Sequence, residues 1–418
     1  MAVSRTILVA GAGLGGLTAA LALAKRGFRA EVFEQSTRLE EIGAGIQLSP
    51  NAMHVLLALG LEEALRPHVV SAECISVRKG SSGRELARVP LGLYAERRYG
   101  APYWMIHRSD LQKVLIEAAR ANPDISVQLG SKVRDFAVHA NGVTAQVQAG
   151  YDADEKRGIA LVAADGLWSA LRRRLGHLAP PRFARRTAWR ATVAADAVPY
   201  RFTEPCVDLW LGRHAHLVHY PVKAGREINI VAIVRDEAGE PGWSREGARK
   251  EIVSRFRRGW AIDARNMVAT PEQWSRWALY DCAPLDHWGE GPVTLLGDAA
   301  HAMLPFLAQG AAMAIEDAIV LAESLAALPD DPARAMRHYE GLRRDRTARA
   351  QREARRNGRR YHASGIEAAL RNLALRGFGG KALLWRYRWL YGWGRGVSLP
   401  AATAPRFDSY RPDEPTEE

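Results

Sequence analysis

The sequence predicts an α/β fold in which a Rossmann-like domain carries an inserted antiparallel sheet and is followed by helices. Three observations predict it. A strand pattern runs into a glycine-rich turn and a helix pattern within the first 26 residues. From about residue 186 to 275 the chain becomes strand-rich, before an Asp/Gly turn returns it to the first domain. After residue 315 the apolar pattern is helical.

The first strand and helix frame the glycine-rich turn. Residues 6–10 (TILVA) read as a buried parallel strand, and apolar residues recur at helical spacing over residues 14–26. Between them, Gly11 permits a tight turn, Gly13 lets a phosphate approach the backbone, and Gly16 lets the helix pack on the strand. The helix N-terminus directs N–H groups and a partial positive charge toward a pyrophosphate.

The second strand ends in a carboxylate suited to a ribose. The pattern predicts a strand over residues 30–33, which leads into Glu34 about 20 residues after the glycines. A carboxylate at this place accepts a hydrogen bond from a ribose hydroxyl. Because all these parts occur in register, we interpret the segment as a dinucleotide site rather than an ordinary glycine-rich turn.

Two later Asp/Gly turns point to the same ligand. Asp165-Gly166 follows a short strand expected over residues 159–163, and Gly297-Asp298 comes late in the chain. The three fragments are about 130 to 150 residues apart, so one ligand that contacts all of them must be large, and FAD meets that requirement. For Asp165-Gly166, a plain type I turn is the alternative.

The inserted segment carries the candidate catalytic side chains. We expect antiparallel strands over residues 207–211, 216–222 and 228–234. In the second strand, two-residue alternation places His214, His216, Val218 and Tyr220 on one face, toward the flavin. His216 and Tyr220 lie about 13 Å apart along a strand and can reach opposite sides of a ring-sized substrate. The alternative is strand residues without catalytic duty, which we favour for His214.

Composition limits the class of protein. The 418 residues suffice for two interleaved domains with a substantial core. Cys74, Cys206 and Cys282 are scattered and odd in number, so we expect no disulfide framework and no metal site. No apolar run reaches the length of a membrane span. These features favour a soluble, cytoplasmic protein.

The expected domains interleave along the chain. We assign residues 1–75, 98–185 and 276–345 to the cofactor domain, 76–97 and 186–275 to the substrate domain, and 346–418 to C-terminal helices with a polar tail.

The net charge of +12 is concentrated in one segment. Residues 341–360 contain nine arginines against Asp345 and Glu353. We expect the solvated face of a long helix, the alternative being salt-sensitive contact with an acidic partner or a membrane surface. No nucleic-acid-binding module accompanies the run, so we expect no nucleic-acid partner. The aromatic segment 385–393 is expected to pack, the alternative being a lipid or partner contact.

Taken together, these motifs resemble a known family, the single-component flavin-dependent aromatic hydroxylases with the para-hydroxybenzoate hydroxylase fold. The similarity is strongest to the branch with salicylate hydroxylase, 3-hydroxybenzoate 6-hydroxylase and 6-hydroxynicotinate 3-monooxygenase, and extends over about residues 5 to 362. Besides the glycine turn it is carried by Gly43-Ala44-Gly45-Ile46-Gln47, His107-Arg108-Ser109-Asp110-Leu111, Asp165-Gly166 with Ser169 and Arg172, and Gly297 to Gly310. Ala302 after His301 departs from the usual His-Pro, which makes that loop less rigid.

The resemblance implies further cofactor contacts. Arg108 would lie by the flavin and its phosphates, and Asp298 would hold the ribityl chain. Asp165 would serve both FAD and a nicotinamide that binds transiently. Gly310 and Ala311 would open a helix toward the flavin's pyrimidine edge, where a helix N-terminus favours the negative charge of the reduced ring.

The resemblance also implies the substrate pocket. His216, Tyr220 and Pro221 match a His-x-x-x-Tyr-Pro pattern of these relatives. Because phenols ionise near pH 10 and imidazole near 6.5, His216 can withdraw a phenolic proton as general base, while Tyr220 orients the ring or its carboxylate. Gln47 and Pro305 would line the pocket, or instead support FAD.

The implied fold is a Rossmann-like FAD-binding domain with an inserted antiparallel β-sheet substrate domain and C-terminal helices. The implied function is a monooxygenase that uses FAD, NADH or NADPH, and O₂ to hydroxylate a small hydroxylated aromatic acid or N-heterocycle through a flavin C4a-hydroperoxide. That chemistry needs a dry cavity, for which the candidates are Met303, Leu304, Phe306 and Leu307.

Two alternatives stay open. One is the same fold acting on a larger polyketide, quinone or antibiotic-like molecule, and the other is a non-catalytic FAD-binding interaction or sensor protein. Weak membrane-surface contact or self-association through the C-terminal region is a further expectation.

Overall fold

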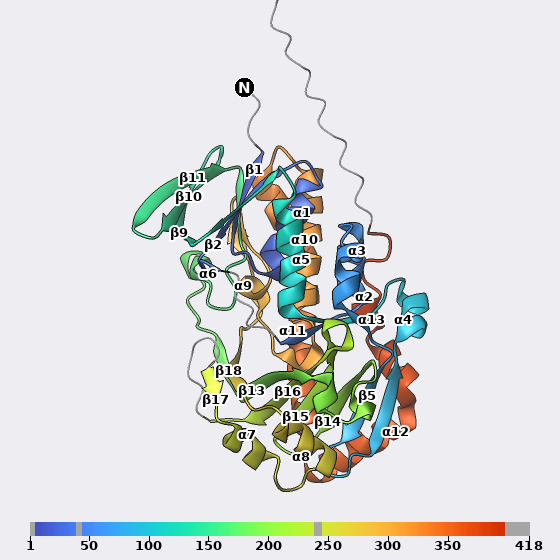
Figure 1. Cartoon of the computed structure of the whole chain (residues 1–418). Helices are drawn as coiled ribbons and strands as arrows, with labels where there is room; N and C mark the ends of the chain where they lie inside the picture. Colours follow the sequence, from blue (N-terminus) through green and yellow to red (C-terminus); the bar gives the residue numbers. More distant parts are fainter. Residues whose placement is uncertain (1–4, 39–43, 238–244, 398–418) are drawn as a thin grey trace, which may run out of the picture.

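The structure is a computed structural model, and it describes residues 5–38, 44–237 and 245–397. Figure 1 shows two parts, with a parallel sheet and its helices at one end of the molecule and a larger, mostly antiparallel sheet at the other. Of the C-terminal helices, α12 (Gly365–Arg386) runs along β6 (Glu85–Pro90) of the larger sheet. The predicted α/β architecture with an inserted sheet and C-terminal helices is confirmed.

The parallel sheet explains why distant turns meet. Among the described residues its order is β19-β20-β12-β1-β2-β8, and β19 alone runs antiparallel to its neighbour. The strands are β1 (Thr6–Ala10), β2 (Arg29–Glu34), β8 (Ile125–Leu129), β12 (Ala160–Ala163), β19 (Gly289–Glu290) and β20 (Val293–Leu295). Because β1, β12 and β20 are parallel neighbours, the turns after them, at Gly11, Asp165 and Gly297, lie at one edge of the sheet.

Helices enclose this sheet. The first helix, α1 (Leu14–Ala24), packs against α5 (Arg108–Arg120) and α10 (Gly310–Ala327), and nearly all of α1 is buried. That enclosure accounts for a sequence that is apolar on all sides rather than on one stripe. The shorter helices of this part are α2 (Pro50–Ala58), α3 (Glu62–Leu65), α4 (Gly92–Tyr99), α6 (Ala170–Arg174), α9 (Asp298–His301) and the 3-10 helix η5 (Pro305–Leu307).

Two small antiparallel sheets complete the first part. One contains β9 (Ser131–His139), β10 (Gly142–Ala149) and β11 (Asp152–Gly158), and the other contains β3 (Gly45–Leu48), β4 (Val70–Ser71) and β7 (Trp104–His107). The second matters for the site, because β3 carries Gln47 beside the larger sheet.

The inserted sheet has the order β17-β18-β13-β16-β15-β14-β5-β6 in the described part of the chain. Its strands are β5 (Cys74–Lys79), β6 (Glu85–Pro90), β13 (Arg182–Ala194), β14 (Cys206–Leu211), β15 (Ala215–Val222), β16 (Glu227–Arg235), β17 (Arg245–Gly247) and β18 (Trp274–Asp281). Pairing is antiparallel except between β14 and β5. One face packs on α7 (Arg249–Arg255) and α8 (Ile262–Ala269) through a core that includes Trp189, Trp210 and Ile252, which leaves the other face for the cofactor domain.

The C-terminal helices are α11 (Pro332–Tyr361), α12 (Gly365–Arg386) and α13 (Arg388–Tyr391). Six of the nine arginines in residues 341–360 are exposed, as expected for a solvated face. For the other three that expectation is wrong, because they have carboxylate partners inside the fold. Arg343 pairs with Glu316 and Asp317 at 2.7 Å, while Arg346 pairs with Glu316 at 2.6 Å. Arg355 pairs with Asp281 at 2.5 Å.

Most of the aromatic C-terminal segment packs, as predicted, but Trp385 is exposed. The Trp389 and Trp393 rings lie over the Arg346 guanidinium at 5.6 and 5.4 Å, and Leu390 and Tyr391 are buried. The polar tail lies outside the described residues. Among the helices that the structure describes, none combines the length and the apolar character needed to cross a membrane.

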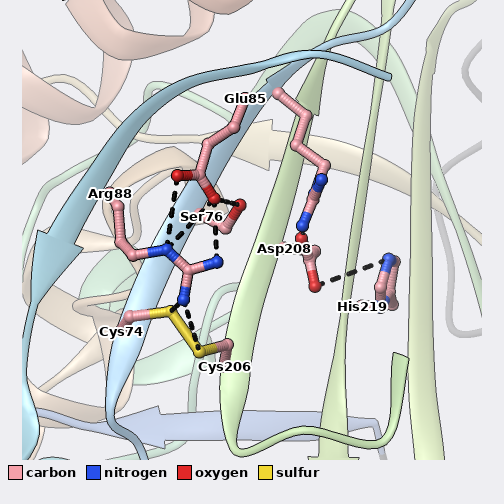
Figure 2. Close-up of a disulfide and its surroundings, with 8 residues drawn as sticks. Cys74, Ser76, Glu85, Arg88, Cys206, Asp208 and His219 are labelled. Atoms are coloured by element: carbon pink, nitrogen blue, oxygen red, sulfur yellow. Dashed lines mark hydrogen bonds and ion pairs between the residues drawn. A yellow bond between two sulfur atoms is a disulfide. The ribbon is translucent and has the colours of Figure 1, made fainter. Parts of the chain in front are cut away.

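The expectation of no disulfide is wrong. Cys74 of β5 and Cys206 of β14 are register partners in adjacent parallel strands, and their sulfurs are bonded (Figure 2). Arg88 of β6 lies against them, with its Nη1 3.4 Å from Cys74 Sγ. The pair is separated by 132 residues, so only the sheet topology reveals it. The cysteine-based argument for a cytoplasmic location therefore fails.

Candidate functional site

A cavity of about 330 Å³ lies between the turns of the parallel sheet and the inserted sheet. The turns after β1, β12 and β20 contribute Gly13, Gly166 and Asp298, and β13, β15 and β16 of the inserted sheet form the facing wall. Segments far apart in sequence thus surround one space at a domain interface, the usual place for a ligand.

The glycine turn is built for close approach. Gly11 has φ +108°, and a Cβ there would lie 2.4 Å from the Ala164 carbonyl oxygen. A Cβ on Gly16 would lie 2.0 Å from the Gly11 carbonyl oxygen, so only glycine lets α1 pack on β1. A Cβ on Gly13 would instead meet open space in the cavity. This is where we predict that a phosphate approaches the helix N-terminus.

Glu34 ends β2 beside the glycine turn. Its carboxylate accepts hydrogen bonds from the backbone N–H groups of Ala12, at 2.8 Å, and Ser36, at 2.9 Å. The side chain therefore already ties the second strand to the turn, and its contact with a ribose stays a prediction.

The two residues of the Asp165-Gly166 turn have different surroundings. Asp165 bonds to the protein backbone, whereas Gly166 lines the cavity. Asp165 Oδ2 accepts from the backbone of Ala170 and Leu171 at 2.9 and 3.3 Å, which caps α6. Burial raises the pKa of this carboxyl above its ordinary value, and its Oδ1 has no partner among the described residues. Gly166, with φ +78°, lines the cavity instead. A contact of Asp165 with cofactor stays a prediction.

The remaining predicted cofactor residues all line the cavity. They are Arg108 at the start of α5, Asp298 at the start of α9, and Gly310 and Ala311 at the N-terminus of α10. The N-terminus of the 18-residue helix α10 therefore meets the cavity, where its dipole favours negative charge. Residues 44–47 line the same space, whereas Gly43 lies outside the described residues.

These residues fit FAD. The open space at Gly13 and two helix N-termini suit a pyrophosphate and an electron-rich ring edge. On β13, Arg190 lines the cavity with an Nε that has no partner among the described residues. Burial and the nearby Arg108 lower the pKa of Arg190 to about 10, so it remains a cation at neutral pH. A cation in this position favours an anionic occupant.

The inserted sheet presents His216, Val218 and Tyr220 to the cavity, as the predicted alternation requires. His214 does not belong to this row. It precedes β15 in a turn with φ +61°, and Arg213 Nε donates to its Nε2 at 3.1 Å. Two-residue periodicity ends where the strand ends, and the turn directs His214 elsewhere.

A smaller cavity of about 130 Å³ adjoins the first. The two share Gln47, His216, Val218, Pro305 and Ala308, so three predicted substrate or catalytic residues lie where the cavities meet. Apolar side chains from β5, β6 and β14 form much of the smaller one, while Tyr220 lines only the larger.

Three of the four apolar residues that were predicted to keep water out of the site line the cavities. Phe306 and Leu307 line the smaller cavity and Met303 the larger, but Leu304 lines neither, because it packs in the core against Ala188.

Gln47 connects two tyrosines across the site. Tyr103 Oη donates to Gln47 Oε1 at 2.6 Å, and Tyr220 also hydrogen bonds to the Gln47 side chain. Burial raises the pKa of both phenols, so they stay protonated and act as neutral hydrogen-bonding groups.

His216 is held as a neutral ring. It is 2 % exposed, and burial with the charge of Arg186 lowers its pKa to about 3. Its Nδ1 lies 2.7 Å from His362 Nε2, and the rings of Phe306 and Tyr361 pack around it. Only Nε2 therefore remains for a molecule in the cavities.

Several residues of the site were not indicated by any sequence pattern described above. Arg190 belongs to a strand that residue alternation did not single out. From the C-terminal helices, Asn357, Tyr361, Leu384 and Tyr391 close the smaller cavity. The aromatic enrichment of residues 385–393, which include Tyr391, was the sequence signal that could have indicated this side of the cavity.

Comparison with known proteins agrees with this geometry. A family model described as "FAD binding domain" matches residues 4–356. The chain is 37% identical over 394 residues to 3-hydroxybenzoate 6-hydroxylase of Polaromonas naphthalenivorans. The aligned region covers 94% of this chain and 97% of that protein. The chain is 33% identical over 352 residues to 6-hydroxynicotinate 3-monooxygenase of Bordetella bronchiseptica, with 83% and 89% covered. A solved substrate complex of salicylate hydroxylase superposes with TM-score 0.79 at 26% identity, covering 96% of this chain and 99% of that one.

Proposed function

The chain belongs to the FAD-binding-domain family of flavin-dependent aromatic monooxygenases, and from this premise we propose that it hydroxylates a small hydroxylated aromatic acid or N-heterocycle. One observation carries the proposal. His216, Gln47 and Pro305 lie at the junction of a cavity suited to FAD and a small, largely apolar second cavity. A substrate ring in the second cavity would present its edge to the first.

The size of the second cavity favours a small substrate. At about 130 Å³ it suits a single aromatic ring better than a polyketide or an antibiotic-like molecule. The similar proteins agree in kind, because one is a hydroxylase of 3-hydroxybenzoate and the other a monooxygenase of 6-hydroxynicotinate.

Within this site, each residue has a proposed task. FAD supplies the redox chemistry when bound, with NADH or NADPH as the proposed reductant. His216 Nε2 accepts the hydrogen bond of the substrate's phenolic O–H and is the proposed general base. Because burial lowers the pKa of His216 to about 3, the proton passes to it only during oxygen transfer. Tyr220 and Gln47 orient the ring, and Pro305 and Val218 keep water away from it.

Arg190, which lines the larger cavity, supports an acidic substrate whose ring lies in the smaller cavity and whose carboxylate extends into the larger one. Its guanidinium is cationic, its Nε has no partner in the described part of the chain, and Trp277 lies 5.3 Å away under its charged group. A carboxylate that reaches this group gains a charge-assisted hydrogen bond. We propose that Arg190 selects acids over neutral phenols.

The proposed setting of the enzyme is the cytoplasm, where NADH and NADPH are supplied. Weak self-association through the C-terminal region is also proposed, because α12 exposes Ile366, Leu370, Leu373 and Phe378. Sedimentation velocity over a range of protein concentrations tests the association, and a monomer throughout would contradict it.

A substrate panel tests the proposed function. Purified protein should contain FAD and oxidise NADH or NADPH several-fold faster with a hydroxybenzoate or hydroxynicotinate than without it, and mass spectrometry should find a hydroxylated product. His216→Ala should retain FAD but lose most product and release more hydrogen peroxide. If no member of the panel is hydroxylated while a larger phenolic compound is, the small-substrate proposal is wrong.

A further inference from the structure

The disulfide borders a third pocket, apart from both cavities of the candidate site. This pocket has a volume of about 470 Å³, and both Cys74 and Cys206 line it. Among the described residues, it shares none of its lining with the other two cavities. A molecule in the pocket therefore reaches a disulfide that is otherwise buried. In the cytoplasm proposed above, such a bond is more often redox-active than structural.

Charged side chains of both signs surround this pocket. Arg88 of β6 and Lys381 of α12 are the cations, and Glu73 and Glu204 are the carboxylates. All four residues are exposed. In the described part of the chain, neither glutamate forms an ion pair, while Lys381 Nζ lies 5.5 Å from the centre of the Tyr94 ring. A ligand complementary to this arrangement carries both a carboxylate and an ammonium group.

Arg88 is held so that one of its nitrogens faces the sulfurs (Figure 2). Its Nε and Nη2 donate to Glu85 Oε2 at 3.2 and 3.0 Å, and Ser76 Oγ donates to the same oxygen at 2.7 Å. Its Nη1 lies 3.4 Å from Cys74 Sγ and 4.0 Å from Cys206 Sγ. Because a nearby cation favours a thiolate, Cys74, whose sulfur is closer, is the better leaving group when the S–S bond breaks.

We propose that the Cys74–Cys206 disulfide exchanges with a small zwitterionic thiol that binds in this pocket, and that substrate affinity follows the exchange. The ligand thiolate attacks Cys206 Sγ, the S–S bond breaks, and Cys74 leaves as a thiolate beside Arg88. A second ligand thiolate attacks the mixed disulfide, which frees Cys206 and releases the ligand as its own disulfide. Two thiols are oxidised while the protein disulfide is reduced, and the two cysteines take up the protons that the ligand thiols lose. The reverse reaction with the ligand disulfide restores the bond.

The strands that the disulfide joins also form part of the substrate cavity. Ile75 and Val207 directly follow the two cysteines, are register partners, and line the smaller cavity. Once the bond is broken, the sulfurs separate from bonded to non-bonded distance, which shifts β5 and β14 where they begin. The affinity for a hydroxybenzoate should therefore differ between the disulfide and thiol forms. This last step rests on the proposed function, whereas the exchange itself goes beyond it.

A charged and an uncharged thiol test the exchange. Reduced glutathione carries carboxylates and an ammonium group, and 2-mercaptoethanol carries neither. The FAD-loaded protein is incubated with each thiol at low salt, and mass spectrometry after alkylation follows the loss of the disulfide. At equal thiolate concentration glutathione should react about 3- to 10-fold faster, as two exposed ion pairs allow, and high salt should abolish the difference. Equal rates at low salt would overturn binding in the pocket.

Variants test the two cations separately. Lys381→Gln should remove most of the advantage of glutathione without changing the rate with 2-mercaptoethanol. Lys113→Gln, at an exposed lysine of α5, is the matched control. Arg88→Gln should slow both thiols, because the Cys74 thiolate loses its cation, and Arg88→Lys should restore part of the rate. Retained FAD absorbance shows that each variant is folded. Wild-type rates in both Lys381→Gln and Arg88→Gln would overturn the proposal.

The position of the adduct tests the order of attack. Peptide mapping should place glutathione on Cys206. In Cys74→Ser no second thiol can expel the ligand, so oxidised glutathione should leave a stable adduct on Cys206. The buried Cys282, which does not line the pocket, is the internal control and should stay unmodified. An adduct on Cys74 in the wild type, or equal modification of Cys282, would overturn the proposed site.

Substrate binding tests the link to the cavity. Titration of the FAD-loaded protein should show that hydroxybenzoate affinity falls about 3-fold or more when glutathione has reduced the disulfide. Equal affinity in the two forms would overturn this link even if exchange occurs. Should neither form bind or hydroxylate any member of the substrate panel, the proposed function fails and the link with it, while the adduct on Cys206 still decides the exchange.

Discussion

Gly45 shows how the absence of one side chain shapes the site. A Cβ there would lie 2.6 Å from Tyr220 Cε2 and 2.9 Å from Asn229 Cγ. Asn229 Oδ1 also accepts from the Gly45 N–H at 2.7 Å, which fixes β3 against the inserted sheet. The second glycine of the Gly-Ala-Gly motif, Gly45, thus has a steric reason in this chain.

Gly45→Ala should therefore displace Tyr220 and cost about 1–3 kcal/mol of stability, as overpacking does. Hydroxylation should fall more than FAD content. Gly341→Ala is the matched control, because a Cβ there meets nothing within 4 Å and the residue lies in a helix. Chemical denaturation and product yield measure both effects, and an unaltered Gly45→Ala protein would contradict the steric account.

Arg190 makes the substrate preference testable. Arg190→Gln should weaken binding of a hydroxybenzoate about 10- to 100-fold, the range of a lost charge-assisted hydrogen bond. Binding of the corresponding neutral phenol should change little. Fluorescence or absorbance titration of the FAD-loaded protein gives both affinities, and equal weakening for acid and phenol would show that Arg190 is not the selector.

At this scale, local patterns could predict only part of the site. Strand alternation was enough to place His216 and Tyr220 on one face, because that face is buried against the cofactor domain. It could not predict that His362 would meet His216, or that Gln47 would link Tyr103 to Tyr220. Those contacts depend on how separate elements pack.

Among the elements, α10 and α11 are joined by a buried ion network. Arg343 contacts Glu316 and Asp317, and Asp317 also accepts from the Gly297 N–H at 3.1 Å and contacts His301 Nε2 at 2.5 Å. Asp317 thus holds the turn that presents Asp298 to the cavity.

Arg343→Met should cost about 3–5 kcal/mol, because it leaves the buried Asp317 without its arginine and Glu316 with Arg346 alone. It should also lower FAD affinity, since the Gly297 turn loses support. Arg352→Met, an exposed arginine of the same helix, should change neither. Urea denaturation and FAD titration measure the two quantities. Equal stability of the two variants would contradict a structural role for the network.

The disulfide marks the limit of prediction at the element scale. Strand patterns over residues 6–10 and 159–163 precede two of the three turns and agree with the predicted convergence, because parallel neighbours end at one edge. The strand before the third turn, β20, was not predicted. The pairing of β5 with β14 has no comparable signal, so Cys74 and Cys206 looked isolated. Likewise, the arginine-rich sequence of α11 predicted a solvated helix face. The carboxylates of α10 that pair with Arg343 and Arg346 come from another element, so the sequence of α11 alone could not indicate them.

For the whole molecule, buried histidines set a pH dependence of stability. The pKa of His216 is lowered to about 3 and that of His219 to about 4, in both cases mainly by burial. At pH values between these lowered pKa values and the ordinary histidine pKa of about 6.5, the unfolded chain binds protons that the folded chain does not. Stability is therefore complete above pH 6.5 and is lost as pH falls, by about 1.4 kcal/mol per pH unit for each ring.

The protein should consequently unfold at a lower urea concentration at pH 5.5 than at pH 7.5. His219→Gln should reduce this pH dependence, whereas His338→Gln, at an exposed position, should not. A variant with His219 replaced that keeps the full wild-type difference between the two pH values would show that His219 is not a source of it.

The central claim is that one space between the cofactor domain and the inserted sheet holds FAD and a small aromatic acid for oxygen transfer. The most direct test supplies the purified protein with NADH or NADPH, a hydroxybenzoate and isotopically labelled dioxygen, and measures the mass of the product. We expect a ring-hydroxylated product that carries one labelled oxygen atom. A protein that retains no flavin, or a product whose new oxygen comes from water, would contradict it.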